Sequence, residues 1–459
     1  MPFKDECGVF GISNQQEAAK QAYLGLYALQ HRGQEATGIC ARENGHLRLH
    51  KAQGYVADVF SESVLESLPG DTAIGHTRYS THGGSLSSAA QPFLVHGRFG
   101  QLALCHNGNL LNTESFRNRL LINGHTFASP SDSEVIIALI NTAKADTLES
   151  AVEEVLQQIR GAFSLLILSE KQLIAARDPH GLRPLAMAKL DDDSIVFASE
   201  SCAFDLLGAD YTREVEAGEM IVLGPDGLQS RFPTKKRGAK PCVFEHVYFA
   251  RPDSLVFSRN VMATRREMGR HLALQHPVDA DIVVPVPDSG VHAALGYAEQ
   301  SGIRFEFGMI RNHYVGRTFI EPKQSIRSFG VKVKLNPVRD LLKGKRVVLI
   351  DDSIVRGTTS KKIVGMVRGV GAAEVHMRIS SPPTTHSCFY GIDTPTREHL
   401  IASHKSKDEI RDFIGADSLD FLSMEGLQKA MGDMAGQGFC YACFNGDYPV
   451  PVEQTNFAC

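Results

Sequence analysis

The segment Arg346-Val-Val-Leu-Ile-Asp-Asp-Ser-Ile-Val-Arg-Gly-Thr-Thr-Ser360 joins an apolar run to a pair of acidic residues and a short polar loop. The run at residues 347–350 predicts a buried strand. After the loop, apolar residues recur with helical spacing at Ile363, Val364, Val367 and Val370. A strand, a loop and a helix in this order indicate an α/β unit, and such folds bind ligands beyond the carboxyl ends of their strands.

The residues of this loop suit a phosphorylated sugar that is bound together with Mg2+. Asp351 and Asp352 offer the hard oxygen ligands that Mg2+ takes in small numbers from proteins. Gly357 lets the main chain approach a phosphate closely, residues 358–360 offer hydroxyl groups, and the helix that follows has an N-terminus that favours an anion. The alternative is an acidic turn followed by an N-capped helix, which any α/β protein can contain.

Taken together, residues 347–359 closely resemble the phosphoribosyl pyrophosphate (PRPP) motif of the type I phosphoribosyltransferases. The resemblance implies an α/β phosphoribosyltransferase domain in which Asp351 and Asp352 bind Mg2+. The residues that it assigns to PRPP are Arg356, Gly357, Thr358, Thr359 and Ser360.

Two further segments resemble parts of the same family. Pro285-Val-Pro-Asp-Ser-Gly290 is similar to its pyrophosphate loop, which would place Asp288 on the substrate and Ser289 on the metal. A plain turn rich in Pro and Gly is the alternative. The long polar and basic segment 311–336 has little periodicity, and loops of this length in compact domains are usually functional or disordered. It resembles the loop that closes over PRPP.

The composition is that of a globular protein with more than one domain. The chain has 459 residues, of which 43% are hydrophobic and 22% charged, and this length predicts roughly two to four domains. A net charge of −4 argues against a nucleic-acid-binding protein, because such proteins are basic. The apolar runs are far shorter than the ~20 residues of a membrane span, and the first residues lack the apolar core of a signal peptide. We therefore expect a cytoplasmic protein with no membrane or nucleic-acid partner.

The two halves of the chain have different patterns. In the first half, short apolar runs alternate with Gly and Asn turns, and we expect two helices, one from Asn14 with Glu17 completing a capping box and one over residues 134–144. This pattern predicts a sheet-rich α+β domain. After the basic segment 231–241, strands and helices alternate, which is typical of a parallel α/β sheet. The predicted domains are residues 7–235 and residues 236–459.

Cys7 lies close to the N-terminus. A free thiol has a pKa of about 8.5 and is mostly protonated at neutral pH. Removal of residues 1–6 as a propeptide would give Cys7 a free α-amino group, with a pKa of about 8, that could act as the base for its thiol. A single cysteine near an N-terminus can also be incidental, so its role depends on the motifs that follow.

Those motifs resemble the N-terminal-nucleophile glutamine amidotransferases over most of residues 7–230. They are His31-Arg-Gly-Gln-Glu35, Gly75-His-Thr-Arg-Tyr-Ser80, His106-Asn-Gly-Asn109 and Ser131-Asp-Ser-Glu134. The resemblance implies a glutaminase domain of the N-terminal-nucleophile hydrolase fold, with Cys7 as the nucleophile.

The same resemblance implies the roles of four further residues. The side chain of Asn107 and the backbone N–H of Gly108 would stabilise the oxyanion that forms when a thiolate attacks an amide. Arg78 can hold the α-carboxylate of glutamine with a bidentate fork, and Asp132 can hold its α-ammonium group. Asn-Gly is also the strongest sequence signal for a type I′ hairpin turn. A turn could hold the same donors rigidly.

In this order, the two domains resemble the glutamine phosphoribosylpyrophosphate amidotransferase family over essentially the full length. The resemblance implies the conversion of PRPP, glutamine and water to 5-phosphoribosylamine, glutamate and pyrophosphate, the first step of de novo purine synthesis. It also implies a homotetramer that purine nucleotides inhibit. An amidotransferase of glucosamine phosphate or asparagine synthesis would lack the PRPP motif. A non-catalytic nucleotide-sensing relative would lack Cys7, Arg78, Asp351 or Asp352, and all four are present.

The nine cysteines of the chain raise the question of a metal, because disulfides are rare in the cytosol. Cys40, Cys105 and Cys202 lie in or beside apolar stretches and are expected to be buried. In the branch of the family that carries a 4Fe-4S cluster, four matching cysteines bind it, and they correspond to Cys242, Cys388, Cys440 and Cys443. A zinc site with four cysteine ligands is the alternative. We expect one structural cluster and one Mg2+ per subunit.

Overall fold

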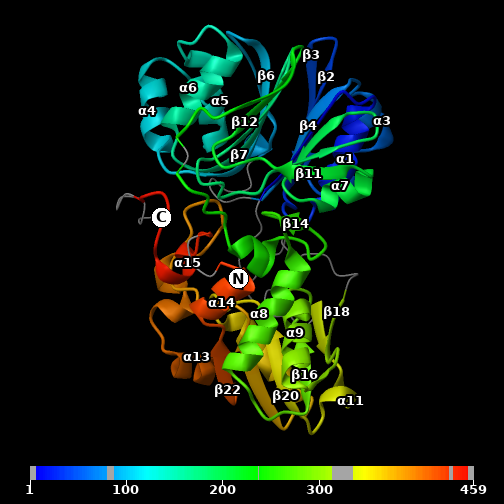
Figure 1. Cartoon of the computed structure of the whole chain (residues 1–459), viewed down its shortest axis with the longest axis vertical. Helices are drawn as coiled ribbons and strands as arrows, with labels where there is room; N and C mark the ends of the chain where they lie inside the picture. Colours follow the sequence, from blue (N-terminus) through cyan, green and yellow to red (C-terminus); the bar gives the residue numbers. More distant parts are fainter. Residues whose placement is uncertain (1–6, 80–86, 236, 313–333, 434–437, 453–459) are drawn as a thin grey trace.

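The computed structural model describes residues 7–79, 87–235, 237–312, 334–433 and 438–452. Two units built on β-sheets lie one above the other along the long axis, the first half of the chain in one and the second half in the other (Figure 1). The first unit ends with strand β13 (Gly227–Arg231), and the second begins after the connecting segment that leads to Cys242.

The first unit is a sandwich of two antiparallel sheets. The seven-stranded sheet has the order β11-β9-β10-β1-β4-β2-β3, and the six-stranded sheet has the order β13-β12-β8-β7-β6-β5. The strands of the first sheet are β1 (Gly8–Ser13), β2 (Ala36–Glu43), β3 (His46–Gln53), β4 (Thr72–Arg78), β9 (Ala186–Lys189), β10 (Ile195–Ala198) and β11 (Asp210–Glu214). Those of the second are β5 (Phe93–Gly97), β6 (Gly100–Leu110), β7 (Gly161–Ser169), β8 (Leu173–Arg177), β12 (Met220–Gly224) and β13.

Helices cover the outer faces of this sandwich, which gives four layers (Figure 1). Successive side chains of β1 point to opposite faces of the sheet, as in any strand. Val9 packs in the core between the two sheets, and Phe10 packs in the core between the sheet and the helices. Helices α1 (Ala18–Ala28) and α7 (Cys202–Leu207) cover the first sheet. Helices α4 (Thr113–Ile122), α5 (Asp132–Thr142) and α6 (Leu148–Gln158) cover the second. The short helices α2 (Val56–Val59) and α3 (Glu62–Glu66) complete the unit.

The first helix begins differently from the prediction. Asn14 and Glu17 both have left-handed backbone conformations, with φ of 64° and 59°, and α1 starts only at Ala18. Glu17 is itself the N-cap residue and its side chain makes no capping hydrogen bond. The predicted capping box is therefore wrong. The tight turn before the helix is instead closed by the main chain, because Ala18 N donates to Gly70 O.

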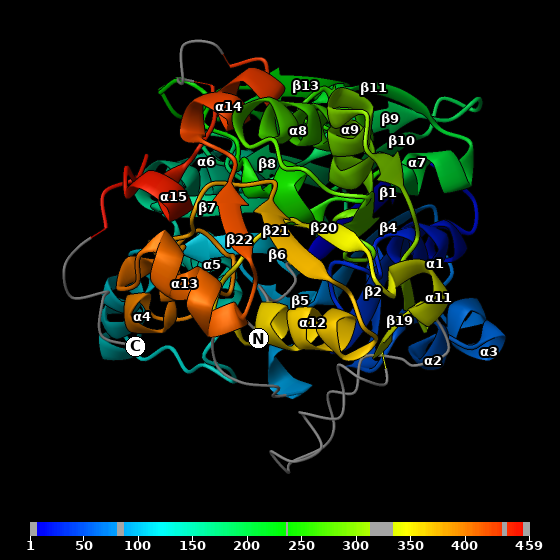
Figure 2. The same cartoon turned by 90° about the horizontal axis from the view of Figure 1, so that it is seen from below.

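The second unit is a parallel sheet with helices on both faces. Its strand order is β17-β16-β20-β21-β22, and all its neighbours are parallel. The strands are β16 (Ile282–Pro285), β17 (Arg304–Phe305), β20 (Arg346–Asp351), β21 (Glu374–Ile379) and β22 (Ser418–Phe421). Helices α8 (Val261–Gln275), α9 (Val291–Ser301) and α14 (Met424–Ala430) pack on one face. Helices α11 (Arg339–Leu342), α12 (Thr358–Gly369) and α13 (Lys407–Ile414) pack on the other (Figure 2).

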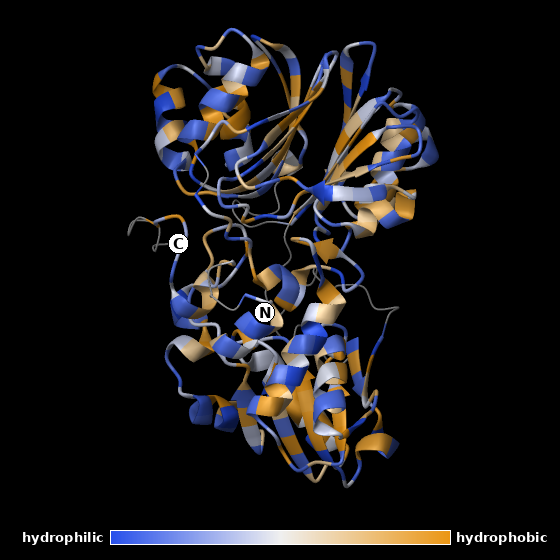
Figure 3. Cartoon of the chain, viewed as in Figure 1, coloured by the Kyte–Doolittle hydropathy of each residue, from blue (hydrophilic) through white to orange (hydrophobic). Residues whose placement is uncertain are grey.

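The hydropathy of the strands explains why both faces of this sheet are covered. Residues 347–350 of β20 are all fully buried, with Val348 and Ile350 in one core and Val347 and Leu349 in the other. Such continuous apolar runs are typical of strands in parallel sheets. The central strands are mainly apolar, whereas the outward faces of the surrounding helices are polar (Figure 3). The sheet thus presents the carboxyl ends of β16 and β20 side by side.

Candidate functional site

Cys7 lies directly before β1, beside the end of β4 that carries Arg78. The register pairs Gly8 with Thr77, and the Cys7 thiol lies 3.6 Å from the carbonyl oxygen of Tyr79. The carbonyl oxygen of Cys7 accepts a hydrogen bond of 3.2 Å from Arg32 Nε. The nucleophile predicted from the sequence is therefore half-buried and is held through its own main chain. Residues 1–6, the predicted propeptide, lie outside the described residues.

Asn107 and Gly108 lie within strand β6, opposite Ser164 and Phe163 of β7. The hairpin turn that the Asn-Gly pair suggested is therefore wrong, because strand pairing outweighs the local turn preference. Asn107 is 1% exposed, and its Nδ2 has no hydrogen-bond partner in the part of the chain that the structure describes. A buried donor without a partner is costly and calls for a ligand or a catalytic explanation. Gly108 has φ +146°, and a Cβ there would come within 2.0 Å of Ala162 O.

Arg78 and Asp132 border the same region. Arg78 ends β4, is buried, and lies 3.9 Å through Nη1 from Glu35 Oε2. Asp132 begins α5, and its Oδ2 accepts a hydrogen bond of 3.1 Å from Leu110 N at the end of β6. Strand β4 contacts β6 across the sandwich. The structure thus brings the ends of two strands and the start of one helix, which carry these predicted residues, to one edge of the sandwich.

His106 positions Asp132, a role that the sequence did not reveal. Its Nδ1 lies 3.5 Å from Asp132 Oδ1 and 3.2 Å from Ser133 Oγ. Burial raises the pKa of the Asp132 carboxyl, but His106, together with the backbone N–H groups of Leu110 and Ser133, outweighs it and holds the pKa below its usual value. Asp132 is therefore ionised at neutral pH. A histidine directly before Asn107 was the available signal.

The second group of predicted residues lines a cavity of about 170 Å³ at the carboxyl ends of the parallel strands. The predicted residues that line it are Ser289, Asp351, Asp352, Arg356, Gly357, Thr358, Thr359 and Ser360. Asp288 is not among the lining residues. It is half-exposed and forms an ion pair with Arg311. Residues 313–333, most of the segment that resembles a closing loop, lie outside the described residues, and β18 (Met309–Arg311) pairs with β19 (Leu335–Pro337) at its two ends.

The two acidic residues of this cavity are almost fully buried. Asp351 is 7% and Asp352 6% exposed. Asp352 accepts hydrogen bonds from Ser289 Oγ at 2.6 Å and from Ser353 Oγ at 2.5 Å. Burial, followed by the neighbouring charge of Asp352, raises the pKa of Asp351 well above its usual range. Two adjacent buried carboxyl groups with a serine oxygen beside them form a set of hard donors that fits a divalent cation such as Mg2+.

Gly357 lets the chain turn sharply into helix α12. It is the N-cap residue with φ +73°, a conformation that favours glycine. A Cβ there would lie 2.9 Å from Ile401 Cδ1. Residues 358–360 form the first turn of α12, so their hydroxyl groups and the N-terminal N–H groups of the helix face the same cavity. This arrangement suits a phosphate group.

The four cysteines assigned to a cluster come from three segments that the fold brings together. Cys242 and Cys440 are partners in a parallel β-bridge. Burial, and then the charges of Cys242, Cys440 and Cys388, raise the pKa of the Cys443 thiol well above its usual range. Within the described ranges, no three His, Cys, Asp or Glu side chains lie close enough together to hold one metal ion. As predicted, Cys40, Cys105 and Cys202 are buried.

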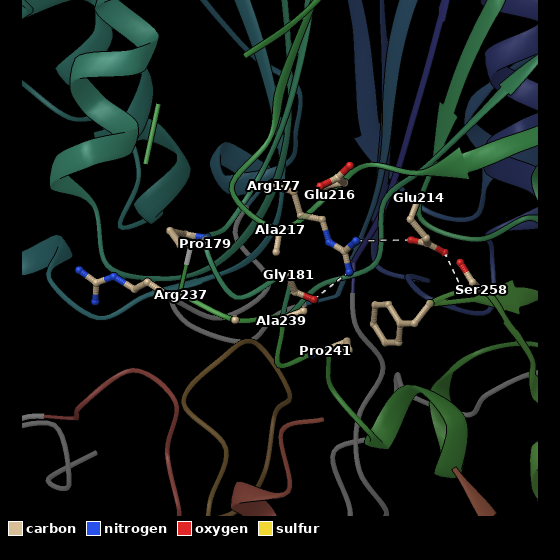
Figure 4. Close-up of a pocket in the computed structure, with 12 residues that line it drawn as sticks. Arg177, Pro179, Gly181, Glu214, Glu216, Ala217, Arg237, Ala239, Pro241 and Ser258 are labelled. Carbon is tan, nitrogen blue, oxygen red and sulfur yellow. Dashed lines mark hydrogen bonds and ion pairs between the residues drawn. The ribbon is translucent and has the colours of Figure 1, made fainter. Parts of the chain in front are cut away.

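A cavity of about 360 Å³ beside the connecting segment was not predicted from the sequence, and none of the predicted residues lines it (Figure 4). Arg177 Nη1 lies 3.5 Å from Glu214 Oε2, and Arg177 Nη2 donates to Gly181 O at 2.8 Å. Burial raises the pKa of Glu214, and Arg177 opposes the shift. The Arg177 and Glu214 charges therefore pair with each other across the lining of this cavity. Its lining comes from distant segments, so no local motif marks it.

Comparison with known proteins first gives the class of the first unit. Residues 76–205 match the family model of a glutamine amidotransferase domain. The fold and the two sites therefore define a glutamine amidotransferase that has a second domain of the phosphoribosyltransferase fold. Both predicted fold classes are confirmed.

Full-length relatives then give the family. Amidophosphoribosyltransferase 2, chloroplastic, of Arabidopsis thaliana is 52% identical over 98% of this chain and 80% of its own length. Amidophosphoribosyltransferase of Bacillus subtilis is 48% identical over 98% of this chain and 95% of its own length. The solved structure of glutamine PRPP amidotransferase from B. subtilis, complexed with ADP and GMP, has a TM-score of 0.92 and 48% identity and covers 98% of each chain. This chain belongs to the amidophosphoribosyltransferase family.

The helices of the described ranges include none that is long and apolar enough to cross a lipid bilayer.

Proposed function

We propose that the protein is a glutamine-dependent amidophosphoribosyltransferase that converts PRPP, glutamine and water to 5-phosphoribosylamine, glutamate and pyrophosphate. The observation that carries the proposal is the presence of both sites in one chain, which matches full-length enzymes of this name at 48–52% identity. The alternative, a non-catalytic nucleotide-sensing relative, is not favoured, because the groups that both half-reactions need are present. The test is an assay of pyrophosphate release from PRPP, which should proceed with glutamine or with an ammonium salt as the nitrogen source. Failure with both would refute the proposal.

In the first half-reaction, the Cys7 thiolate attacks the side-chain amide carbon of glutamine. The C–N bond breaks, ammonia leaves after taking up a proton, and water then hydrolyses the thioester to glutamate. Asn107 Nδ2, which is buried and has no partner in the described chain, and the Gly108 N–H stabilise the oxyanion. Arg78 binds the α-carboxylate of glutamine, and the ionised Asp132 binds its α-ammonium group.

The proposed mechanism requires removal of residues 1–6. An uncleaved chain leaves Cys7 with an amide nitrogen, which cannot act as a base, whereas cleavage leaves an α-amino group beside the thiol. We expect intact-mass measurements of the active protein to show Cys7 as the first residue. Active protein that still carries Met1 or Pro2 would refute this mechanism. The two proposed domains then comprise residues 7–235 and 236–459.

In the second half-reaction, ammonia that has passed internally from the first site attacks C1 of PRPP. The bond from C1 to the pyrophosphate oxygen breaks, pyrophosphate leaves, and the nitrogen loses a proton. Residues 356–360, which include the first turn of α12, hold PRPP in the cavity. Asp288 lies outside the lining and pairs with Arg311 in this structure, and we propose that it contacts PRPP from the neighbouring loop. Ser289, Asp351 and Asp352 would hold one Mg2+, which supplies positive charge to the phosphates. Positioning and charge stabilisation account for this step.

We further propose that Cys242, Cys388, Cys440 and Cys443 bind one 4Fe-4S cluster. All three other cysteines act on the Cys443 thiol through their charge, so the fold gathers the four thiols in one region. A zinc ion with the same four cysteine ligands is the alternative. Four cysteine thiolates are the usual ligand set of a 4Fe-4S cluster, which supports the cluster. Its role is structural, because neither half-reaction transfers electrons.

Loss of the cluster should destabilise the whole protein, because the free energy of metal binding becomes folding free energy when the unfolded chain has no site. We expect Cys440→Ser to give little soluble enzyme, and anaerobically purified wild type to be brown with about four irons per chain. Cys202→Ser, a change in a buried cysteine outside the set, should retain the iron. A colourless, fully active protein with one zinc per chain would refute the cluster.

Regulation, assembly and compartment are also part of this proposal. The B. subtilis structure contains ADP and GMP, and another similar structure, 49% identical with a TM-score of 0.93, is described as an allosteric regulatory enzyme of purine biosynthesis. These relatives support two proposals for this chain: that purine nucleotides inhibit it, and that it catalyses the first step of purine synthesis. We propose a homotetramer in the cytoplasm. Several plant relatives are named chloroplastic.

A further inference from the structure

Four charged side chains are fully buried where the two units meet. Arg32, Arg183 and Glu200 belong to the first unit, and Glu245 belongs to the second. Glu245 begins the short helical turn η2 (Glu245–Phe249), whose apolar residues pack in the core that α8 and α9 share with the parallel sheet. The position of the Glu245 carboxylate is therefore set by the second unit, although its partners lie in the first.

Arg32 connects Glu245 to the residue that carries the nucleophile. Its Nη1 and Nη2 donate to the two carboxylate oxygens of Glu245 at 2.9 and 2.8 Å. Its Nη1 also contacts Glu200, and its Nε donates to the carbonyl oxygen of Cys7 at 3.2 Å. A bidentate pair fixes the plane of a guanidinium group, which a single contact does not. The plane that Glu245 imposes directs Nε at Cys7.

We propose that Glu245 is a positioning residue of the glutaminase site, through which the second unit sets the geometry of Cys7. The inference rests on the proposed function, in which Cys7 is the nucleophile at the end of the processed chain. A terminal residue has main-chain neighbours on one side only, so its carbonyl group is an important anchor. Without the Glu245 carboxylate, Arg32 would keep Glu200 but lose the partner that fixes its plane.

The same carboxylate is linked to the oxyanion strand through Arg183. Arg183 Nη1 lies 3.3 Å from Glu245 Oε1, and Arg183 Nε donates to Tyr390 O at 2.8 Å. The loop that contains Tyr390 packs against β6: Phe389 O accepts from Asn109 Nδ2 at 2.9 Å, and a Cβ on Gly391 would come within 3.1 Å of Gly108 Cα. Contacts from the second unit thus extend to both the nucleophile and the oxyanion strand of the first unit. Glu245 takes part in both sets of contacts, through Arg32 and through Arg183.

A purely structural ion network is the competing explanation, because removal of one charge from a buried pair destabilises a protein wherever the pair lies. The chain offers a matched control in Glu219, which is 1% exposed and holds Arg213 bidentately at 2.7 Å. This pair lies within the first unit, and Glu219 accepts its other hydrogen bonds from the Glu216 N–H and the Ser230 hydroxyl, away from Cys7 and Arg32. Glu245→Gln and Glu219→Gln each remove the charge of a buried carboxylate that holds an arginine bidentately, although Arg213 is partly exposed, and only the first variant acts on the nucleophile.

The test compares these variants in the full-length enzyme with glutamine and with ammonium salt. For Glu245→Gln we expect kcat with glutamine to fall by about tenfold or more, because small displacements of a reacting group have large effects. Activity with ammonium salt should stay within twofold of wild type, and alkylation of Cys7 by a diazoketone analogue of glutamine should slow in parallel with kcat. Glu219→Gln should lower the melting temperature but keep glutamine kinetics within twofold.

Unchanged glutamine kinetics and alkylation in Glu245→Gln would overturn the inference, and so would an equal loss with both nitrogen sources. If that variant is insoluble, Glu245→Asp keeps the charge but is too short to hold both guanidinium nitrogens as before. It should fold and show a smaller, glutamine-specific loss of kcat, and wild-type kinetics in it would also refute the role. A wild type that is inactive with glutamine would instead refute the proposed function itself.

Discussion

Cys7→Ala should abolish glutamine-dependent formation of 5-phosphoribosylamine and leave the ammonia-dependent reaction intact. The variant has no thiol to form the thioester, and loss of a covalent nucleophile costs on the order of 10⁴-fold or more in rate. The cavity at the carboxyl ends of the parallel strands, by contrast, has no cysteine among the described residues that line it. The measurement is pyrophosphate release with each nitrogen source at saturating PRPP.

Cys40→Ala is the matched control. Cys40 lies on β2 in the core between the two sheets, and burial raises the pKa of its thiol to about 12. It is therefore protonated at neutral pH and cannot act as a nucleophile. This variant should keep both activities. If Cys7→Ala retained glutamine-dependent synthesis, or lost the ammonia-dependent reaction while folded, the assignment of two separate sites would be wrong.

The second unit could be predicted in detail because its strands are short, apolar and flanked by clear helices. The predicted strand at residues 347–350 lies within β20, and the helix predicted after the loop is α12. In the first unit the sequence suggested two helices and missed others. Helix α6 buries Leu148, Val152 and Val155 with helical spacing, so its periodicity is visible in the sequence. Helix α4 leaves the apolar residues Leu121 and Ile122 exposed, so its apolar residues do not mark a single buried face in the sequence.

The site was predictable where a local motif carries the chemistry and not where distant segments meet. The acidic pair at 351–352 and the loop after it form one continuous motif, and they line one cavity. Arg32 stood within a noted motif, but its partners Glu200 and Glu245 lie 168 and 213 positions away in the sequence. Only the folded chain shows that these carboxylates hold Arg32, whose Nε donates to the carbonyl oxygen of Cys7. Likewise, strand pairing with β7 placed Asn107 in a strand, although the dipeptide itself favours a turn.

The double variant Asp351→Asn, Asp352→Asn should lose synthesis with both nitrogen sources, because the protein then lacks the two carboxylates that would hold Mg2+ beside PRPP. The same variant should be more stable than wild type in the absence of Mg2+. The pKa of Asp351 is raised by burial and by the charge of Asp352, so the folded state favours its neutral form. The stability from this group is fully present below its unfolded pKa of about 3.9. It is lost progressively as the pH rises from the unfolded towards the folded value, so at pH 7 this group destabilises the fold relative to a neutral side chain.

Thermal unfolding with and without Mg2+ checks this prediction. Mg2+ should raise the melting temperature of the wild type, by an amount that corresponds to about 2.7 kcal/mol at a hundred times its Kd, and should leave that of the double variant unchanged. The control is Asp279→Asn with Asp281→Asn, at the opposite ends of the same strands, where both carboxylates pair with Arg346. Arg346 lowers the pKa of Asp281, so its ionised form stabilises the fold above the unfolded pKa. That control should therefore lose stability but keep both activities and its response to Mg2+. A double variant at 351 and 352 that is less stable than wild type without Mg2+, or that still responds to it, would show that the buried acidic pair is not the metal site.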